Sequence, residues 1–294
     1  MRKVMFYSYK GGCGRTTGAA NVAAALAKVG KRVLCLDLDI EGPGLHVLSH
    51  HYDTEEFHIQ QYLREPEPNE SEMEVEEVES HVVDVLGNFK DNTDIPAATR
   101  QVLARLEFEG TLGCMHLLPA TQHVNYVAAR GTYLEKKLSR LCEYFNDSYD
   151  FMIIDSSSGI GNMSALGMTI ADLVLVFFLW SRQSFAGTLH MCRFLNSLKG
   201  TRQARPYWLI SSTVPSLPED VQSSVRYRER MESLKTQLLN QVEGDEGFRF
   251  LSISERIDLR WEERVVVFDD TAAITDYENI ARELISTTVE NGAT

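Results

Sequence analysis

Short apolar runs alternate with helix-like segments along most of the chain, and this alternation is the strongest constraint on its fold. Strands that are continuously rich in Val, Ile, Leu and Phe, each followed by a helix, are typical of a parallel sheet covered on both faces. The sequence therefore predicts an α/β fold with a doubly wound, mostly parallel sheet and helices on both faces. The predicted strands are residues 3–9, 32–38, 115–120, 149–155, 173–180, 206–212 and 248–254. The predicted helices are residues 15–29, 122–146, 161–171, 185–199, 218–241 and 275–289.

The chain has 294 residues, and we interpret residues 1–294 as one domain whose C-terminal part, 214–294, is divergent. One segment interrupts the alternation. Residues 64–80 contain eight Glu and two Pro, which predicts a solvated, mobile loop or insertion. A docking site for a basic partner is the alternative interpretation of this acidic segment.

Composition narrows the range of functions. The net charge of −13 argues against a protein whose whole surface coats nucleic acid or an anionic membrane. The longest apolar run, 173–180, has the length of a strand and is far shorter than the ~18 residues that span a bilayer. Five scattered cysteines without a C-x-x-C pair fit reduced thiols, and the N-terminus predicts a strand instead of a signal peptide. We therefore expect a cytoplasmic protein.

A glycine-rich turn, KGGCGRTT at residues 10–17, joins the first predicted strand to the first predicted helix. Gly11, Gly12 and Gly14 let the backbone take positive φ and approach a ligand closely. Successive N–H groups of such a turn can form a nest for phosphate oxygens. A plain turn between a strand and a helix is the alternative interpretation. The preceding apolar strand and the Ala-rich helix that follows favour a nucleotide site.

The turn departs from the strict P-loop pattern, G-x-x-x-x-G-K-[ST], at two positions. Tyr9 replaces the first glycine and Arg15 replaces the lysine. Arg15 keeps the positive charge but offers a planar, forked set of donors, so it can bind phosphate with a different geometry. Thr16 and Thr17 open the helix, whose free N–H groups favour anions. We expect the Thr16 hydroxyl to bind Mg²⁺ and Thr17 to contact the α-phosphate.

Carboxylates follow two other predicted strands. Asp37 and Asp39 end the second strand on one face, which suits a position beside Mg²⁺ or an attacking water. Asp155 follows an apolar strand directly, as does a carboxylate that holds a Mg²⁺-bound water. A helix N-cap or turn residue is the alternative role for Asp155. Gly159 and Gly161 give the next loop the freedom to respond to a γ-phosphate.

These residues resemble the ParA/MinD family of P-loop ATPases, in the SIMIBI class. The deviant Walker A motif of that family reads K-G-G-x-G-K-[ST], and KGGCGRT matches it except at Arg15. A bacterial subgroup reads K-G-G-V-G-R-[ST], and the chain looks most similar to it. The stretches LDLDIEGPG and YDFMIIDSSSGIG resemble the second motif and the Walker B and switch region. The resemblance covers most of residues 1–200 and is weak beyond 205.

The resemblance implies that ATP and Mg²⁺ bind and that ATP holds two subunits face to face as a homodimer. Lys10 would reach across the dimer interface, Arg15 would take the phosphate contact within its own subunit, and Asp39 would orient the attacking water. The catalytic residues would then be Lys10, Arg15 and Asp39. The metal site would comprise Thr16, Asp37 and Asp155. The nucleotide-binding residues would be Lys10, Gly11, Gly12, Cys13, Gly14, Arg15, Thr16 and Thr17.

The favoured function is a slow, Mg²⁺-ATP-dependent dimerising switch that positions or regulates a protein partner. One alternative is a nucleotide-held dimer that does not hydrolyse ATP and acts as a binding module. Another is a DNA-partitioning ATPase, whose candidate basic residues are Arg193, Lys199, Arg202, Arg205, Arg226, Arg228 and Arg230. The acidic tail argues against a membrane-surface helix, and we expect no membrane partner. Switch-loop serines explain Ser156–Ser158 better than nucleophiles do, because no paired base is evident.

Overall fold

The computed structural model describes residues 1–39, 42, 44–45, 104–106, 111–118, 131–201, 204–214, 222–241, 248–256, 259, 265–268 and 275–291. The acidic segment 64–80 lies outside the described residues. So do the first parts of two predicted helices, 122–130 and 218–221.

Eight strands of the described residues form one sheet, in the order β3-β4-β2-β5-β1-β6-β7-β8. Every neighbouring pair is parallel except β3 and β4. The strands are β1 (Arg2–Ser8), β2 (Arg32–Leu38), β3 (Ala104–Leu106), β4 (Cys114–Leu118), β5 (Phe151–Ser156), β6 (Leu173–Phe178), β7 (Tyr207–Val214) and β8 (Phe250–Ser254). The predicted mostly parallel sheet is confirmed. The short antiparallel edge strand β3 is an addition that the sequence analysis missed.

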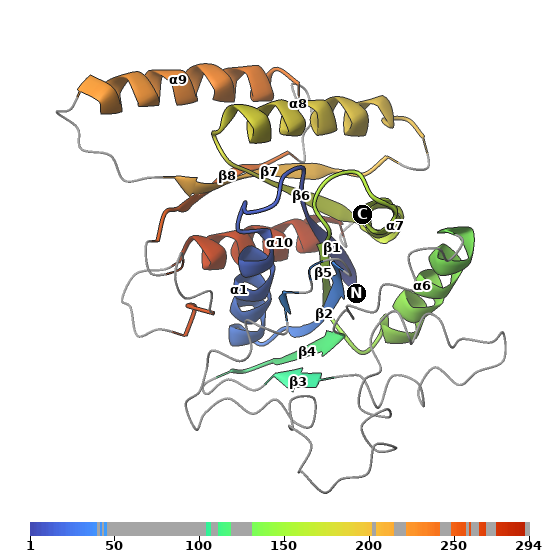
Figure 1. The fold of residues 1–294 in the computed structure, drawn as a ribbon. Coiled ribbons are helices and arrows are strands. Elements are labelled where there is room, and N and C mark those ends of the chain that lie inside the picture. The colour runs from blue at the N-terminus through green and yellow to red at the C-terminus, as the bar shows by residue number, and fades with distance from the viewer. Residues whose placement is uncertain are drawn as a thin grey trace, which may run out of the picture.

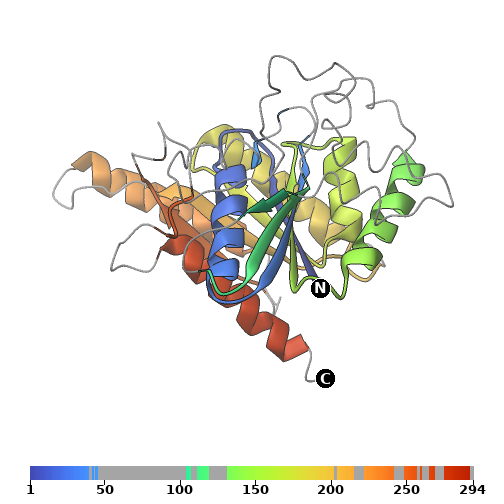
Figure 2. The same ribbon diagram turned by 90° about the horizontal axis from the view of Figure 1, so that it is seen from below.

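Helices cover both faces of this sheet, as predicted (Figures 1 and 2). The core on one face contains side chains of α1 and α10, and the core on the other face contains side chains of α6, α7, α8 and α9. The helices are α1 (Arg15–Lys28), α6 (Gly131–Phe145), α7 (Asn162–Ile170), α8 (Arg182–Ser197), α9 (Gln222–Leu239) and α10 (Asp276–Asn291). No helix within the described ranges is long and apolar enough to cross a bilayer.

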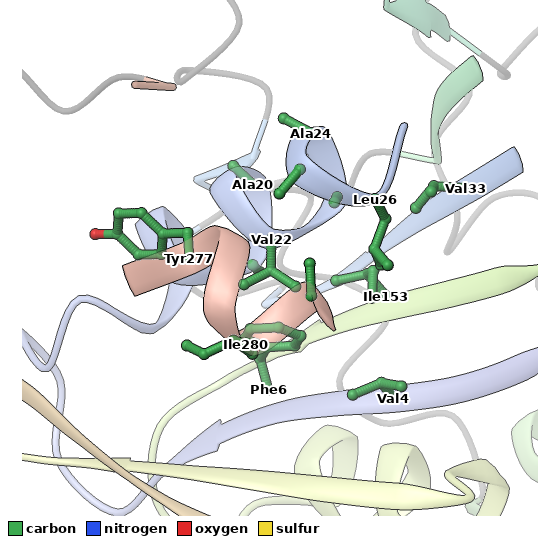
Figure 3. Close-up of a cluster of buried hydrophobic side chains, with 14 of the residues drawn as sticks. Val4, Phe6, Ala20, Val22, Ala24, Leu26, Val33, Ile153, Tyr277 and Ile280 are labelled. Atoms are coloured by element: carbon green, nitrogen blue, oxygen red, sulfur yellow. The ribbon is translucent and has the colours of Figure 1, made fainter. Parts of the chain in front are cut away.

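Helix α1 is enclosed between the sheet and α10. Its small side chains, from Ala19 to Ala27, are buried, so the helix can approach both neighbours closely. Figure 3 shows Tyr277 and Ile280 of α10 beside Val22, with Phe6 of the sheet below them. Burial on several sides explains why an Ala-rich segment without a clear polar face is nevertheless a helix here.

Two polar side chains, Asn21 and Arg2, fasten this layer by hydrogen bonds. Asn21, fully buried in α1, donates from Nδ2 to the Thr17 carbonyl (2.9 Å) and accepts at Oδ1 from the Val266 N–H (2.7 Å). Arg2 in β1 donates to the Leu284 carbonyl of α10 at 2.6 Å and to the hydroxyls of Thr287 and Thr288. These contacts join α1 to residue 266 and β1 to α10, which lie far apart in the sequence.

Gly18, in the second turn of α1, lies against the ring of Phe177 in β6. A Cβ at position 18 would lie 2.6 Å from Cε1 of Phe177, closer than real Cβ atoms approach their neighbours. Both residues are buried, so neither can move without disturbing the core. Gly18 thus sets the distance between the sheet and the start of α1.

We predict that Gly18→Ala lowers the free energy of unfolding by about 1–2 kcal/mol, because overpacking against Phe177 outweighs the gain in helix propensity. Chemical denaturation measures this. The control is Gly167→Ala in α7, where the nearest atoms belong to the flexible end of Met5 at 3.2 Å and can shift. An equal effect of both substitutions would contradict the assigned role of Phe177.

Candidate functional site

The strand order brings three predicted site segments together at the carboxyl ends of the central strands β1, β5 and β2. Strand β5 lies between β1 and β2, with Asp155 aligned to Phe6 on one side and to Asp37 on the other. The glycine-rich turn leaves the carboxyl end of β1, and Asp39 follows the carboxyl end of β2. Carboxyl ends of parallel strands are where such sheets bind ligands. The chain crosses over β5 between β1 and β2, which places Asp155 between the other two segments.

The glycine-rich turn leads into the N-terminus of α1. Gly12 and Gly14 have φ of 72° and 68°, in the left-handed region that favours glycine, and Gly14 is the N-cap of α1. The first intrahelical bond of this turn runs from the Gly18 N–H to the Gly14 carbonyl at 2.8 Å. The N–H groups at the start of α1 therefore have no acceptor within the helix, which suits an anion.

Tyr9, at the position of the first P-loop glycine, rests against α8. A Cβ at Gly187 of α8 would overlap with the ring of Tyr9, so this glycine makes room for the aromatic side chain. Cys13 is buried beside Ser184 of α8, with 3.7 Å between Sγ and Oγ, and burial raises the pKa of its thiol. A buried thiol of raised pKa is unreactive, so Cys13 serves as a small side chain that fills the space between the turn and α8. The contribution of Gly187 was missed, because a lone glycine in a helical pattern carries no signal about its neighbour.

Arg15 lies against the carboxyl ends of β2 and β5. Its Nε donates to Oδ1 of Asp155 at 2.6 Å and its Nη2 donates to Oδ2 of Asp39 at 2.7 Å. A longer contact of 3.3 Å joins Nη2 to the Thr16 hydroxyl oxygen. The Arg15 side chain is 8% exposed, and those of Asp39 and Asp155 are 14% and 0% exposed. The structure thus joins the predicted residues Arg15, Asp39 and Asp155 in one nearly buried ion-pair network.

Charge and burial oppose each other in this network. Burial acts to lower the pKa of Arg15, but the charges of Asp155 and Asp39 more than offset it and raise that pKa. Burial also pushes the pKa of Asp155 upward, against the positive charge of Arg15. The second oxygen of Asp155, Oδ2, is buried and has no hydrogen-bond partner among the described residues. The site is therefore rich in carboxylate oxygen, with one guanidinium to balance it.

Asp37 organises the loop that follows β2. Its Oδ1 accepts from the Asp39 N–H at 2.9 Å, and its Oδ2 accepts from the N–H groups of Gly44 and Leu45, each at 3.3 Å. Burial, followed by the nearby charge of Asp155, raises the pKa of Asp37 to about 8. These contacts hold Gly44 against the Thr16 side chain. The predicted metal role of Asp37 stays a prediction, since its described contacts are all to the backbone.

The loop after β5 lies against the glycine-rich turn. Gly159, with a φ of 77°, donates its N–H to the Ser8 carbonyl at 3.0 Å. Ser156 is buried and donates to the Phe6 carbonyl at 3.0 Å, and Ser164 caps the end of the loop by accepting from the Gly161 N–H. The engaged Ser156 hydroxyl favours the switch-loop interpretation over a nucleophile. A conformational change in one of these two loops would therefore displace the other.

The remaining predicted residues differ in exposure. Lys10, Gly11 and Gly12 are exposed at the rim of the turn, whereas Thr17 is buried. Lys10 has no ion pair within the described ranges. The basic candidates Arg193, Lys199, Arg226, Arg228 and Arg230 are exposed on α8 and α9 and at the end of α8, while Arg202 is outside the described residues. Arg205 instead donates to the Thr169 carbonyl at 2.8 Å.

A magnesium ion fits the donor set of this site. Magnesium prefers oxygen ligands, and usually takes a few from the protein and others from water and substrate phosphates. The unpartnered, buried Oδ2 of Asp155 and the Thr16 hydroxyl are oxygens of this kind, with Asp39 beside them.

A family model described as an AAA domain matches residues 1–205. Among curated relatives, the sporulation initiation inhibitor protein Soj of Bacillus subtilis is 28% identical over 172 residues, which are 57% of this chain and 54% of that protein. The chain thus spans about half the length of this relative. The family-model match, residues 1–205, covers the part of the chain that supplies the candidate site.

Two solved structures share the fold. The MinD cell division protein of Aquifex aeolicus aligns with a TM-score of 0.64 at 20% identity, over 97% of this chain and 98% of that one. An ATP complex of a McdA variant from Cyanothece aligns with a TM-score of 0.64 at 18% identity, over 97% and 96% of the two chains. At this identity the alignments support the fold. They extend beyond residue 205, where the sequence resemblance was weak.

We predict that Arg15→Met lowers the free energy of unfolding of the ligand-free protein by about 3 kcal/mol, because it leaves Asp155 buried without a cation. The control is Arg32→Met. Arg32 also pairs with an aspartate, Asp150 at 2.9 Å, but the two side chains are 48% and 36% exposed. Water screens an exposed pair, so its removal should change stability much less. Equal losses in chemical denaturation would show that the Arg15 network does not stabilise the fold in this way.

Proposed function

The chain belongs to the AAA-domain family of ParA/MinD-like P-loop ATPases, and we propose that it is a Mg²⁺-ATP-dependent dimerising switch that hydrolyses ATP slowly. The single observation that carries this proposal is the arrangement at the sheet edge. An unsatisfied helix N-terminus suited to phosphate lies beside Arg15, Asp39 and Asp155. The similar McdA structure is a complex with ATP, which supports the choice of nucleotide.

We assign the roles of the chain's own groups as follows. The N–H groups of the turn and of the first turn of α1 hold the phosphates, and residues 10–17 form the nucleotide site. Thr16 and Asp155 hold the metal, which when bound neutralises developing phosphate charge. Asp39 orients the attacking water. Asp37 keeps the loop after β2 in place through its backbone contacts with Asp39, Gly44 and Leu45.

The exposure of Lys10 supports a role between two subunits. A cation at the rim of the turn, without an ion pair to the described residues, is available to phosphates held by a second copy of the chain. Such a contact forms only when nucleotide is bound. ATP would then join two subunits through their nucleotide faces.

We predict that Lys10→Ala leaves the protein monomeric in the presence of Mg²⁺ and a non-hydrolysable ATP analogue, while the wild type becomes dimeric. Light scattering coupled to size exclusion measures the mass of each. Lys136→Ala, which removes an exposed lysine from α6, is the control and should dimerise like the wild type. If Lys10→Ala still forms a nucleotide-dependent dimer, the proposed contact of Lys10 with the second subunit is wrong.

We predict that Asp39→Ala lowers the rate of phosphate release by about 100-fold or more, the usual scale for losing a group that positions or activates a nucleophile. The assay is phosphate release with Mg²⁺-ATP at saturating nucleotide. Glu135→Ala on α6 is a matched acidic control on the surface and should retain the wild-type rate. No release from the wild type would favour the alternative of a nucleotide-held dimer that acts as a binding module.

We propose that the switch positions or regulates a protein partner, and that the protein acts in the cytoplasm. The names of the similar proteins, a sporulation initiation inhibitor and a cell division protein, support a regulatory or positioning role. DNA partitioning is the second candidate, favoured by the exposed arginines of α8 and α9. Glu229 and Glu232 interrupt the basic residues of α9, and this weakens the DNA footprint that nucleic-acid binding requires.

A further inference from the structure

The Arg15 guanidinium lies among the same oxygens that the proposed function gives to magnesium and the attacking water. It donates to Oδ1 of Asp155 at 2.6 Å and to Oδ2 of Asp39 at 2.7 Å, and lies 3.3 Å from the Thr16 hydroxyl oxygen. The sequence assigns each of these three residues a metal or water role. It assigns Arg15 to a phosphate.

A buried carboxylate needs a cation or several hydrogen-bond donors to remain charged. Asp155 is fully buried, and its Oδ1 accepts from Arg15, while Oδ2 has no hydrogen-bond partner among the described residues. In this arrangement Arg15 balances the charge of Asp155. A second cation at the same oxygens would face like-charge repulsion at short range, in a site that water screens poorly.

We propose that Arg15 is a positioning residue that competes with magnesium for Asp155 and Asp39, and so determines how much magnesium the site needs to bind nucleotide. The inference rests on the proposed function and deepens it. Because Arg15 is the first residue of α1, rotation about its side-chain bonds can release the carboxylates without moving the turn. The freed guanidinium then lies at the helix N-terminus, where phosphate oxygens can replace the carboxylates.

Lysine, the standard residue at this position, is a weaker competitor. The fork of a guanidinium places two separate N–H donors on two different carboxylates, as Nε and Nη2 do here. An ammonium is a single point charge on a flexible stem and cannot reproduce this bridge. Arg15→Lys therefore keeps the charge and removes the geometry on which the competition depends.

The test is a magnesium titration of the binding of a fluorescent, non-hydrolysable ATP analogue. Relative to the wild type, we expect the magnesium concentration at half-maximal binding to fall by about tenfold in Arg15→Lys, the scale of one charge-assisted hydrogen bond. Arg32→Lys makes the same change in the exposed pair with Asp150, and its midpoint should equal that of the wild type. A fall in both variants, or in neither, would overturn the competition.

Failure of the proposed function gives a different result. If the wild type and Arg15→Lys both fail to bind the analogue at any magnesium concentration, the nucleotide site itself is wrong and the competition falls with it. Binding of the analogue with equal midpoints leaves the nucleotide site in place and rejects the role of Arg15 alone.

A measurement on the wild type keeps the inference falsifiable if Arg15→Lys does not fold. The Nε–H of Arg15 should be protected from solvent exchange by its 2.6 Å contact with Asp155, and its nuclear magnetic resonance signal reports this protection. We expect this signal to shift when magnesium is added to the analogue complex, because Arg15 then loses the Asp155 carboxylate as its acceptor. A signal that is unchanged in the magnesium complex would overturn the proposal.

Discussion

The contact on which the site depends is the bridge from Arg15 to Asp155 and Asp39, because it joins three segments that are far apart in the sequence. Removing charges from water is costly, and the bridge compensates for it only because Arg15 makes a short hydrogen bond to each of the two carboxylates. The glycine-rich turn, the end of β2 and the end of β5 are therefore held together by the need to balance the charges of Asp39 and Asp155. Any ligand that displaces Arg15 must supply positive charge to the same two carboxylates.

Topology explains why a single side chain can make this bridge. Strand β5 lies between β1 and β2, so the chain must cross over it between the first two strands. The crossover helix α1 begins at the edge where all three strands end, and Arg15 is its first residue. Small side chains along α1 and the bare backbone at Gly18 let the helix lie close to the sheet. The position of the site follows from strand order and close packing.

The sequence predicted the parallel strands, the helices and the gathering of the turn, Asp39 and Asp155, because apolar runs and strand ends carry these signals. It did not predict the direction of Arg15, since a pattern gives the residue type at a position but not its rotamer. The hydrogen bonds of Asp37 to the backbone, and the space that Gly187 leaves for the ring of Tyr9, were also not predicted. Both depend on residues brought together by the fold, which spacing along one strand or helix does not reveal.

The joining of β1 and α1 to the distant helix α10 has a consequence for biosynthesis. Arg2 needs acceptors on α10, and the Ala-rich face of α1 is covered by α10 and by residues 265–267. During translation these partners emerge long after α1 does, since domains are made from the N-terminus onward. The nascent chain thus carries an uncovered apolar helix until α10 has been synthesised, and the layer that supports the candidate site is incomplete until then.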